Sequence, residues 1–300
     1  MIEINGISKS FGEINALKNI NAKIEDGHVF GLIGTNGAGK STLLRCIAGV
    51  YKPDAGTITV DQEPVYENPS AKAKIFYVSD DQYFLPGSTP KEMLVNYKTF
   101  YPDFDIERFH EFMNILKLEE TRKISTFSKG MKKQLSIAFG ICANTKYLLC
   151  DETFDGLDPV IRQAVKKLFV KEVDSRDFTP IIASHNLREL EDVCEHVGLL
   201  HEGGILFTRD LDEMKLGMYK LQCVFSNTAD EEVLKNNFTI MQRHQRGSLI
   251  TITLKGQKDR ITNVMATITP IFWELLPLTL EEIFISETEV LGYDFENLTK

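Results

Sequence analysis

One segment, Gly34–Ser41, constrains the fold of this chain more than any other, because it reads GTNGAGKS and fits the pattern G-x-x-x-x-G-K-[ST]. It follows an apolar run typical of a buried strand, Val29–Ile33, and it precedes a helical pattern that begins at Thr42. Small residues let the backbone wrap an anion closely, so that successive N–H groups and the helix N-terminus point at phosphate oxygens. The alternative, a glycine-rich turn with a chance lysine, does not explain the order strand, loop, helix.

The side chains of this loop predict a nucleoside triphosphate bound together with Mg²⁺. Lys40 is expected to reach the β- and γ-phosphates, and the Ser41 hydroxyl is expected to ligate Mg²⁺. The residues predicted to bind the nucleotide here are Gly34, Asn36, Gly37, Ala38, Gly39, Lys40, Ser41 and Thr42.

Composition excludes several classes of protein. The apolar content of 43% and the charged content of 26% are those of an ordinary globular chain, and the net charge of −9 argues against general nucleic-acid binding. No stretch approaches the roughly 20 apolar residues of a membrane span, and the N-terminus has no secretion-signal pattern. The five cysteines lack C-x-x-C spacing and are expected to be reduced core thiols. We therefore expect a cytosolic protein whose membrane role, if any, comes through a partner.

The order of strand-like and helical sequence patterns changes near residue 217. Before it, strand-like runs alternate with helical patterns, which predicts a largely parallel sheet covered on both faces. After it, two strand-like runs and intervening helical stretches predict a small α+β domain of about 80 residues. We therefore expect two domains, residues 1–216 and 217–300. The expected strands are 2–7, 19–24, 57–60, 74–78, 147–150, 180–183, 197–200, 205–207, 221–225 and 249–254, and the expected helical regions of the first domain include 90–118, 128–142 and 186–194.

A buried apolar strand is expected to end in two carboxylates, Asp151 and Glu152. Asp151 is expected to hold Mg²⁺ through water, because Mg²⁺ favours carboxylate plus retained water. Glu152 is positioned to polarise an attacking water, which typically contributes about 10²–10⁴-fold to a rate. The alternative is an acidic turn at a strand end, and the phosphate loop favours the catalytic interpretation.

Four further segments carry a resemblance to a known family. Phe127–Gln134, which opens a helix, resembles the signature motif L-S-G-G-Q of ATP-binding cassette (ABC) ATPases in the S-K-G-M form seen in some of them. Phe154–Asp158 resembles the D-loop of that family, and Ala183–His185 matches its switch histidine. Phe11 matches its adenine-stacking aromatic residue, for which a core phenylalanine is the alternative.

The resemblance covers about residues 1–215 and implies the fold and mechanism of an ABC cassette. The fold is a P-loop NTPase with a mostly parallel sheet and with antiparallel-β and helical subdomains. Two such domains are implied to pair head to tail around two ATP molecules, with His185 contacting the γ-phosphate. Because the chain has one phosphate loop and one signature motif, a second copy is needed; a homodimer is expected, and a paralogous subunit is the alternative. The residues implied to contact the ATP of the opposite subunit are Ser128, Gly130 and Asp158.

This sequence differs from the family pattern at one position that is expected to lie near Mg²⁺. A glutamine that touches Mg²⁺ usually stands where this chain has Asp80, and Gln82 comes two residues late. Asp80 can ligate Mg²⁺, but a third carboxylate near Asp151 and Glu152 adds like-charge repulsion when the metal is absent, so its role is left open. The other departures are Lys129 and Met131 in the signature motif and Asp155 in the D-loop.

The segment 280–284, which reads LEEIF, resembles the ending of bacterial exporter-type ATPase subunits similar to drug- or antibiotic-resistance transporters. The hypothesis is an ATP-binding and ATP-hydrolysing subunit of an ABC transporter, which couples dimer closure to a separate membrane permease for export. We expect it at the inner face of the cell membrane, held there by the permease, with no nucleic-acid partner.

Three alternatives remain open from the sequence. A soluble ABC ATPase acting on the ribosome or DNA usually carries a second cassette or long heptad insertions, which this chain lacks. A phosphotransferase built on the same loop would not explain the Ser128–Met131 segment or the D-loop. A protein that binds ATP without turnover would not need Glu152 and His185.

Overall fold

The computed structural model describes residues 1–211, 217–225 and 229–283. The chain divides into two compact units, Met1–Arg209 and Asp210–Lys300. The sequence places the boundary between residues 216 and 217, further along the chain than this division after Arg209. The two domains expected from the sequence, 1–216 and 217–300, stay a prediction. Within the described ranges, none of the helices combines the length and apolarity that a membrane span requires.

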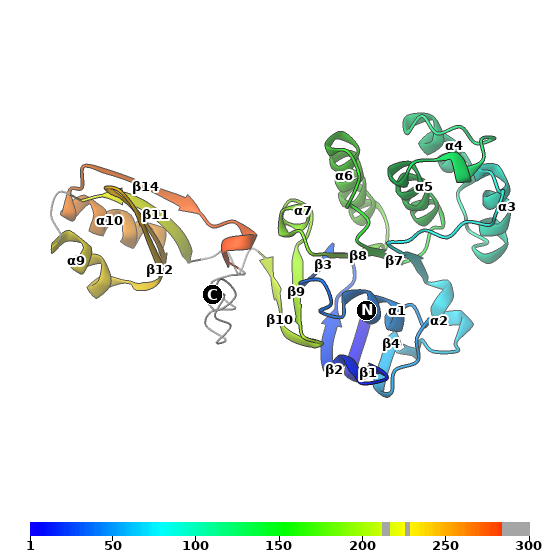
Figure 1. The fold of residues 1–300 in the computed structure, drawn as a ribbon, viewed down its shortest axis with the longest axis horizontal. Coiled ribbons are helices and arrows are strands. Elements are labelled where there is room, and N and C mark those ends of the chain that lie inside the picture. Colours follow the sequence, from blue (N-terminus) through cyan, green and yellow to red (C-terminus); the bar gives the residue numbers. More distant parts are fainter. Residues whose placement is uncertain (212–216, 226–228, 284–300) are drawn as a thin grey trace. The chain divides into compact units, whose positions relative to one another are not determined.

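A parallel sheet forms the centre of the first unit (Figure 1). Strand β3 pairs in parallel with β8 and β9, and β7 pairs in parallel with β6 and β8. Every residue of β3, β7 and β8 is buried, which is typical of parallel strands covered on both faces. The expected fold class is therefore confirmed. The sheet has the order β10(Gly204–Asp210)-β9(His196–His201)-β3(Phe30–Ile33)-β8(Thr179–Ser184)-β7(Tyr147–Asp151)-β6(Ile75–Val78) in the described part of the chain.

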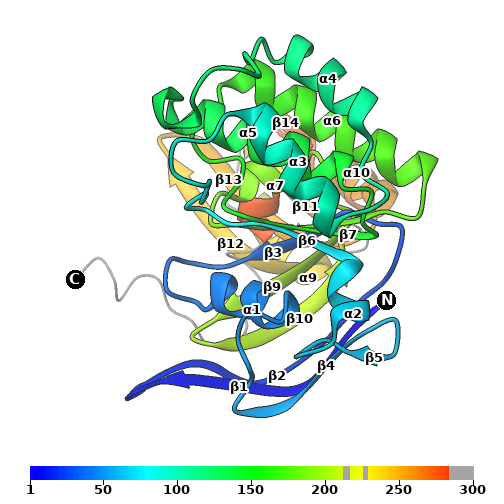
Figure 2. The same ribbon diagram turned by 90° about the vertical axis from the view of Figure 1, so that its right-hand side faces the viewer.

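A second, antiparallel sheet covers one face, with helix α1 (Lys40–Ile47) between the two sheets (Figure 2). Leu43 and Leu44 of α1 share one buried cluster with residues of both sheets. The strands predicted at 2–7 and 19–24 are longer in the structure, at Ile2–Phe11 and Ile14–Ile24. The residues near the tip of this hairpin lie outside the buried core, so their sequence does not alternate between apolar and polar residues. The sheet has the order β2(Ile14–Ile24)-β1(Ile2–Phe11)-β4(Ala55–Val60)-β5(Glu63–Pro64), and the short helix α2 (Pro69–Ala73) follows it.

Helices cover the opposite face of the central sheet (Figures 1 and 2). The region 90–118, for which helical periodicity is expected, contains two helices: Pro102 follows the end of the first, and Asp105 caps the second by accepting from the Arg108 N–H. Pro159 begins a helix behind its cap Asp158. The helices are α3 (Pro90–Phe100), α4 (Ile106–Ile115), the 3₁₀ turn η1 (Ile124–Thr126), α5 (Lys129–Cys142), α6 (Pro159–Ser175) and α7 (Leu187–Glu191).

Between residues 218 and 277, the described part of the second unit contains an antiparallel sheet and two helices in the order β-α-β-β-α-β, which is typical of the split βαβ motif. Leu234 of the first helix and Met265 of the second pack with Leu221 and Ile252 of the sheet in one buried cluster. Phe284, the last residue of the exporter-like segment, lies outside the described residues. The elements are β11 (Met218–Val224), α9 (Ala229–Asn237), β12 (Thr239–Arg246), β13 (Leu249–Lys255), α10 (Lys258–Ile268) and β14 (Phe272–Pro277), with the sheet order β12-β13-β11-β14.

Candidate nucleotide-binding site

The predicted phosphate loop joins the end of β3 to the start of α1, and two of its glycines are required by close backbone contacts. Gly39 caps α1 with a φ of 106°, and a Cβ there would lie 2.5 Å from the carbonyl oxygen of Ala16. A Cβ on Gly34 would lie 2.5 Å from the carbonyl oxygen of Leu200. No side chain fits at either position, so the loop is held tightly against β2 and β9.

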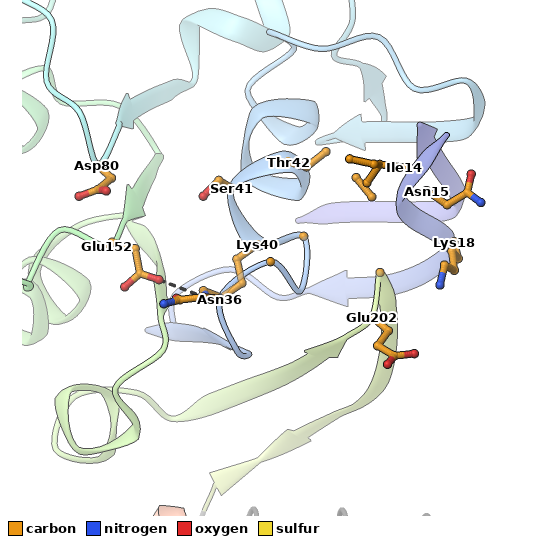
Figure 3. A pocket seen from close by; sticks show the side chains of 14 residues that line it. Ile14, Asn15, Lys18, Asn36, Lys40, Ser41, Thr42, Asp80, Glu152 and Glu202 are labelled. Atoms are coloured by element: carbon orange, nitrogen blue, oxygen red, sulfur yellow. Dashed lines mark ion pairs between the residues drawn. The ribbon is translucent and has the colours of Figure 1, made fainter. Parts of the chain in front are cut away.

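A cavity of about 630 Å³ opens beside this loop (Figure 3). Its size is typical of a small-molecule site. The predicted residues that line it are Asn36, Gly37, Gly39, Lys40, Ser41, Thr42, Asp80 and Glu152. Six further lining residues carry no local sequence signal and reach the cavity from the β1–β2 hairpin and the β9–β10 turn: Ile14, Asn15, Ala16, Lys18, Glu202 and Gly203. Four of the remaining predicted residues hydrogen-bond to lining residues: Gly34, Ala38, Asp151 and His185.

Lys40 is 5% exposed, and its ammonium group lies inside the loop. Its Nζ donates to the carbonyl oxygens of Gly34 at 2.8 Å and Thr35 at 3.2 Å. The same atom lies 3.2 Å from Glu152 Oε1, the ion pair drawn in Figure 3. The loop, the lysine and the strand-end glutamate therefore form one site.

Asp151 is buried at the end of β7 and accepts two hydrogen bonds. Ser41 Oγ donates to Oδ1 at 2.9 Å, and the Tyr77 hydroxyl donates to Oδ2 at 2.9 Å. Burial raises the pKa of Asp151, although the hydrogen bonds from Ser41 and Tyr77 act in the opposite direction. Arg45 Nε in turn donates to the Tyr77 hydroxyl at 3.3 Å. A carboxylate and a hydroxyl side by side suit a hard cation such as Mg²⁺, which takes few protein ligands.

Glu152 has an unusual backbone conformation and two partners for its carboxylate. Its φ of 47° lies in the left-handed region, which costs a non-glycine residue on the order of 1–3 kcal/mol and occurs often at functional sites. Oε2 lies 2.9 Å from His185 Nδ1, while Oε1 faces Lys40. The two predicted catalytic residues, Glu152 and His185, are therefore in contact.

Asp80 lines the cavity but also pairs with a lysine, Lys133, that the sequence does not predict as part of the site. Asp80 Oδ1 lies 3.1 Å from Lys133 Nζ, and Lys133 is fully buried. Lys133 lies in the signature segment, and its spacing from the buried residues Ile137 and Gly140 places it on the inner face of α5. The like-charge repulsion expected around Asp80 is thus opposed by a buried cation.

Gln82 Nε2 donates to the carbonyl oxygens of Ser79 and Asp80, both at 2.9 Å. This side chain therefore caps its own loop and holds the backbone of Asp80 in place.

Phe11 is not among the residues that line the cavity. It is 44% exposed, and its ring packs edge to face against Tyr51 with the centroids 5.4 Å apart. Ile14, its neighbour across the hairpin, lines the cavity and is 70% exposed. The adenine-stacking role of Phe11 stays a prediction.

Ser128, Gly130 and Asp158 lie apart from the cavity lining of their own chain. Ser128 caps α5 by accepting from the Met131 N–H, and Asp158 caps α6. Both side chains are exposed, and a Cβ on Gly130 would lie 3.1 Å from the Gly156 carbonyl oxygen. The signature segment and the D-loop are therefore neighbours.

Fold and site together define a P-loop nucleotide-binding protein. The family model described as ABC transporter matches residues 17–155. The ABC transporter ATP-binding protein YtrB of Bacillus subtilis is 33% identical over 96% of this chain and 98% of its own length. The bacitracin transport ATP-binding protein BcrA of Bacillus licheniformis is 28% identical over 88% of this chain and 89% of its own. The dimeric structure of the ATP-binding cassette MJ0796 with ADP and Pi has a TM-score of 0.63 at 23% identity, covering 70% of this chain and 99% of that one.

The chain belongs to the ABC transporter family, as one of its ATP-binding subunits. Its reaction is ATP hydrolysis coupled to transport.

Proposed function

We propose that two copies of this chain close on two ATP molecules and thereby drive a separate membrane permease. The observation that carries the proposal is the separation of two half-sites: the phosphate loop lines the cavity, whereas exposed Ser128 and Asp158 lie apart from it. A second copy supplies the missing half-site to each ATP. Removal of the γ-phosphate then releases the closed state.

Each residue of the cavity has a defined task in this proposal. Lys40 and the N-terminus of α1 bind the phosphates, and Ser41 and Asp151 would hold Mg²⁺, which would supply positive charge against the negative charge of the nucleotide. Among the described residues no group of three or more His, Cys, Asp or Glu side chains is suited to a metal.

Glu152 polarises the attacking water, and its contact with His185 orients the carboxylate. Glu152→Gln keeps the shape of the side chain but removes its basicity, so we expect ATP binding without turnover. Glu25→Gln, at an exposed glutamate paired with Lys23, serves as the control and keeps the wild-type rate. Wild-type hydrolysis by Glu152→Gln would show that another group is the base.

We propose export as the direction of transport, with a drug- or antibiotic-like cargo. The resemblance of the 280–284 segment and the likeness to a bacitracin transport protein support it. The permease holds the chain at the inner face of the membrane. Import, and pairing with a paralogous subunit, are the alternatives.

Co-purification from detergent-solubilised membranes tests the partner. The tagged full-length chain is expected to recover a polytopic membrane protein, and Lys40→Ala should recover the same protein because Lys40 lies inside the nucleotide cavity. Recovery of ribosomes or DNA in its place would contradict the proposal.

A further inference from the structure

We propose that Lys133 is a positioning residue for ATP hydrolysis, which holds the backbone of Glu152 and links it to Asp80. The inference rests on the proposed role of Glu152. Lys133 lies on α5, immediately after the signature segment, and its side chain is fully buried. A buried lysine requires strong partners, because removing an ammonium group from water is costly.

The first partner is the Glu152 carbonyl oxygen, which accepts a hydrogen bond from Lys133 Nζ at 2.6 Å. The N–H of Glu152 donates to the Ala183 carbonyl oxygen at 3.0 Å. Both backbone polar groups of this left-handed residue are therefore anchored, one by α5 and the other by β8. Without the lysine the carbonyl group loses its charged donor, and the residue is freer to return to an ordinary φ.

The direction of the Glu152 side chain depends on that backbone conformation. Its carboxylate lies between Lys40 and His185, at 3.2 Å and 2.9 Å. A shift of φ would move the carboxylate away from both partners and from the cavity. Lys133 itself is absent from the cavity lining among the described residues, so its effect on the site passes through Glu152 and Asp80.

The second partner is Asp80, which does line the cavity (Figure 3). Its Oδ1 lies 3.1 Å from Lys133 Nζ, and its side chain is 48% exposed. One ammonium group thus bridges the loop after β6 and the end of β7. A ligand that displaces Asp80 changes the partners of Lys133 and, through them, the position of Glu152.

The test compares ATP turnover with nucleotide affinity in the full-length chain. We expect Lys133→Met to lower kcat about 10- to 100-fold, the usual effect of losing a hydrogen bond from a charged group, while the affinity for AMP-PNP changes less than about twofold. Lys133→Gln keeps a donor and should be intermediate. Lys166→Met is the matched control, because Lys166 is also buried, 4% exposed, and pairs with Asp192 at 3.2 Å away from the cavity.

Asp80→Ala completes a double-mutant cycle. It should lower kcat while nucleotide binding survives, and its effect should largely disappear in the Lys133→Met background. A full effect in both backgrounds would mean that Asp80 acts independently, for example on the metal, and would overturn the link.

Three other results would overturn the positioning role: wild-type kcat in Lys133→Met, an equal loss in Lys166→Met, or a parallel loss of AMP-PNP affinity. Glu152→Gln separates the two hypotheses. If that variant is inactive while Lys133→Met is fully active, only the positioning role fails; if Glu152→Gln is active, the role of Glu152 fails first.

Discussion

A buried glutamate joins two helices of the ATPase unit, α4 and α6, and its removal should destabilise that unit. Glu172 on α6 is 2% exposed and accepts from Arg108 of α4, with 2.9 Å between Nη1 and Oε2. It also lies 2.9 Å from Arg176 Nε, and Arg176 in turn donates to the Thr145 carbonyl oxygen at 2.9 Å. Glu172→Gln keeps the volume of the side chain but removes the charge between the two arginines.

The cost follows from the burial of the pair. Breaking a buried ion pair costs about 3–5 kcal/mol, and because Arg108 and Arg176 are 25% and 22% exposed we expect about 2–4 kcal/mol here. Burial raises the pKa of Glu172, but the two arginines outweigh it, so the pKa lies below its usual value of 4.5. A lowered pKa gives stability that is present above the unfolded value and is lost as the pH falls through the folded value. The effect of Glu172→Gln should therefore be largest near pH 7 and smaller below about pH 4.

Denaturant unfolding followed by two probes measures this effect. Far-ultraviolet circular dichroism reports mainly on the larger unit, whereas the single tryptophan, Trp273, lies on β14 of the second unit. Glu172→Gln should shift the first transition and leave the Trp273 fluorescence transition in place. Glu25→Gln, at an exposed pair, should shift neither. An unchanged first transition, or an equal loss at pH 4 and pH 7, would show that the charge of Glu172 does not stabilise this unit.

Two further substitutions address the nucleotide site. Gly39→Ala should abolish ATP binding, because its φ of 106° and the Ala16 carbonyl oxygen 2.5 Å away leave no room for a Cβ; calorimetric titration measures this, and normal affinity would contradict the tight loop. Phe11→Ala should weaken ATP binding by about 5- to 150-fold, which corresponds to about 1–3 kcal/mol of base stacking. Its melting temperature should change little because the ring is 44% exposed, and unchanged ATP affinity would show that Phe11 only packs against Tyr51.

The sequence predicts correctly those features that depend only on residues close to one another along the chain. The phosphate loop and the carboxylate pair at the end of β7 each depend on a few neighbouring residues. Pro102 also offered a local signal for the break between α3 and α4, but the apolar periodicity on both sides concealed it.

The parts of the site that the sequence does not predict depend on contacts between segments far apart in the chain. Lys133 meets Asp80 across 53 positions, and Tyr77 meets Asp151 across 74. The cavity walls at Ile14 and Glu202 come from hairpins that only the packed sheets bring to the loop. A single sequence carries no periodicity that pairs such residues, so their roles became visible only in the fold.

Light scattering measures the mass of the Glu152→Gln variant with and without Mg²⁺-ATP, and it tests most directly whether two copies of the chain close on ATP. We expect a mass near 34.0 kDa without nucleotide and roughly twice that with it, and the added substitution Ser128→Arg should prevent the increase while ATP still binds. If the variant binds ATP but keeps the mass of one chain, the chain does not pair around ATP and the proposed function is wrong.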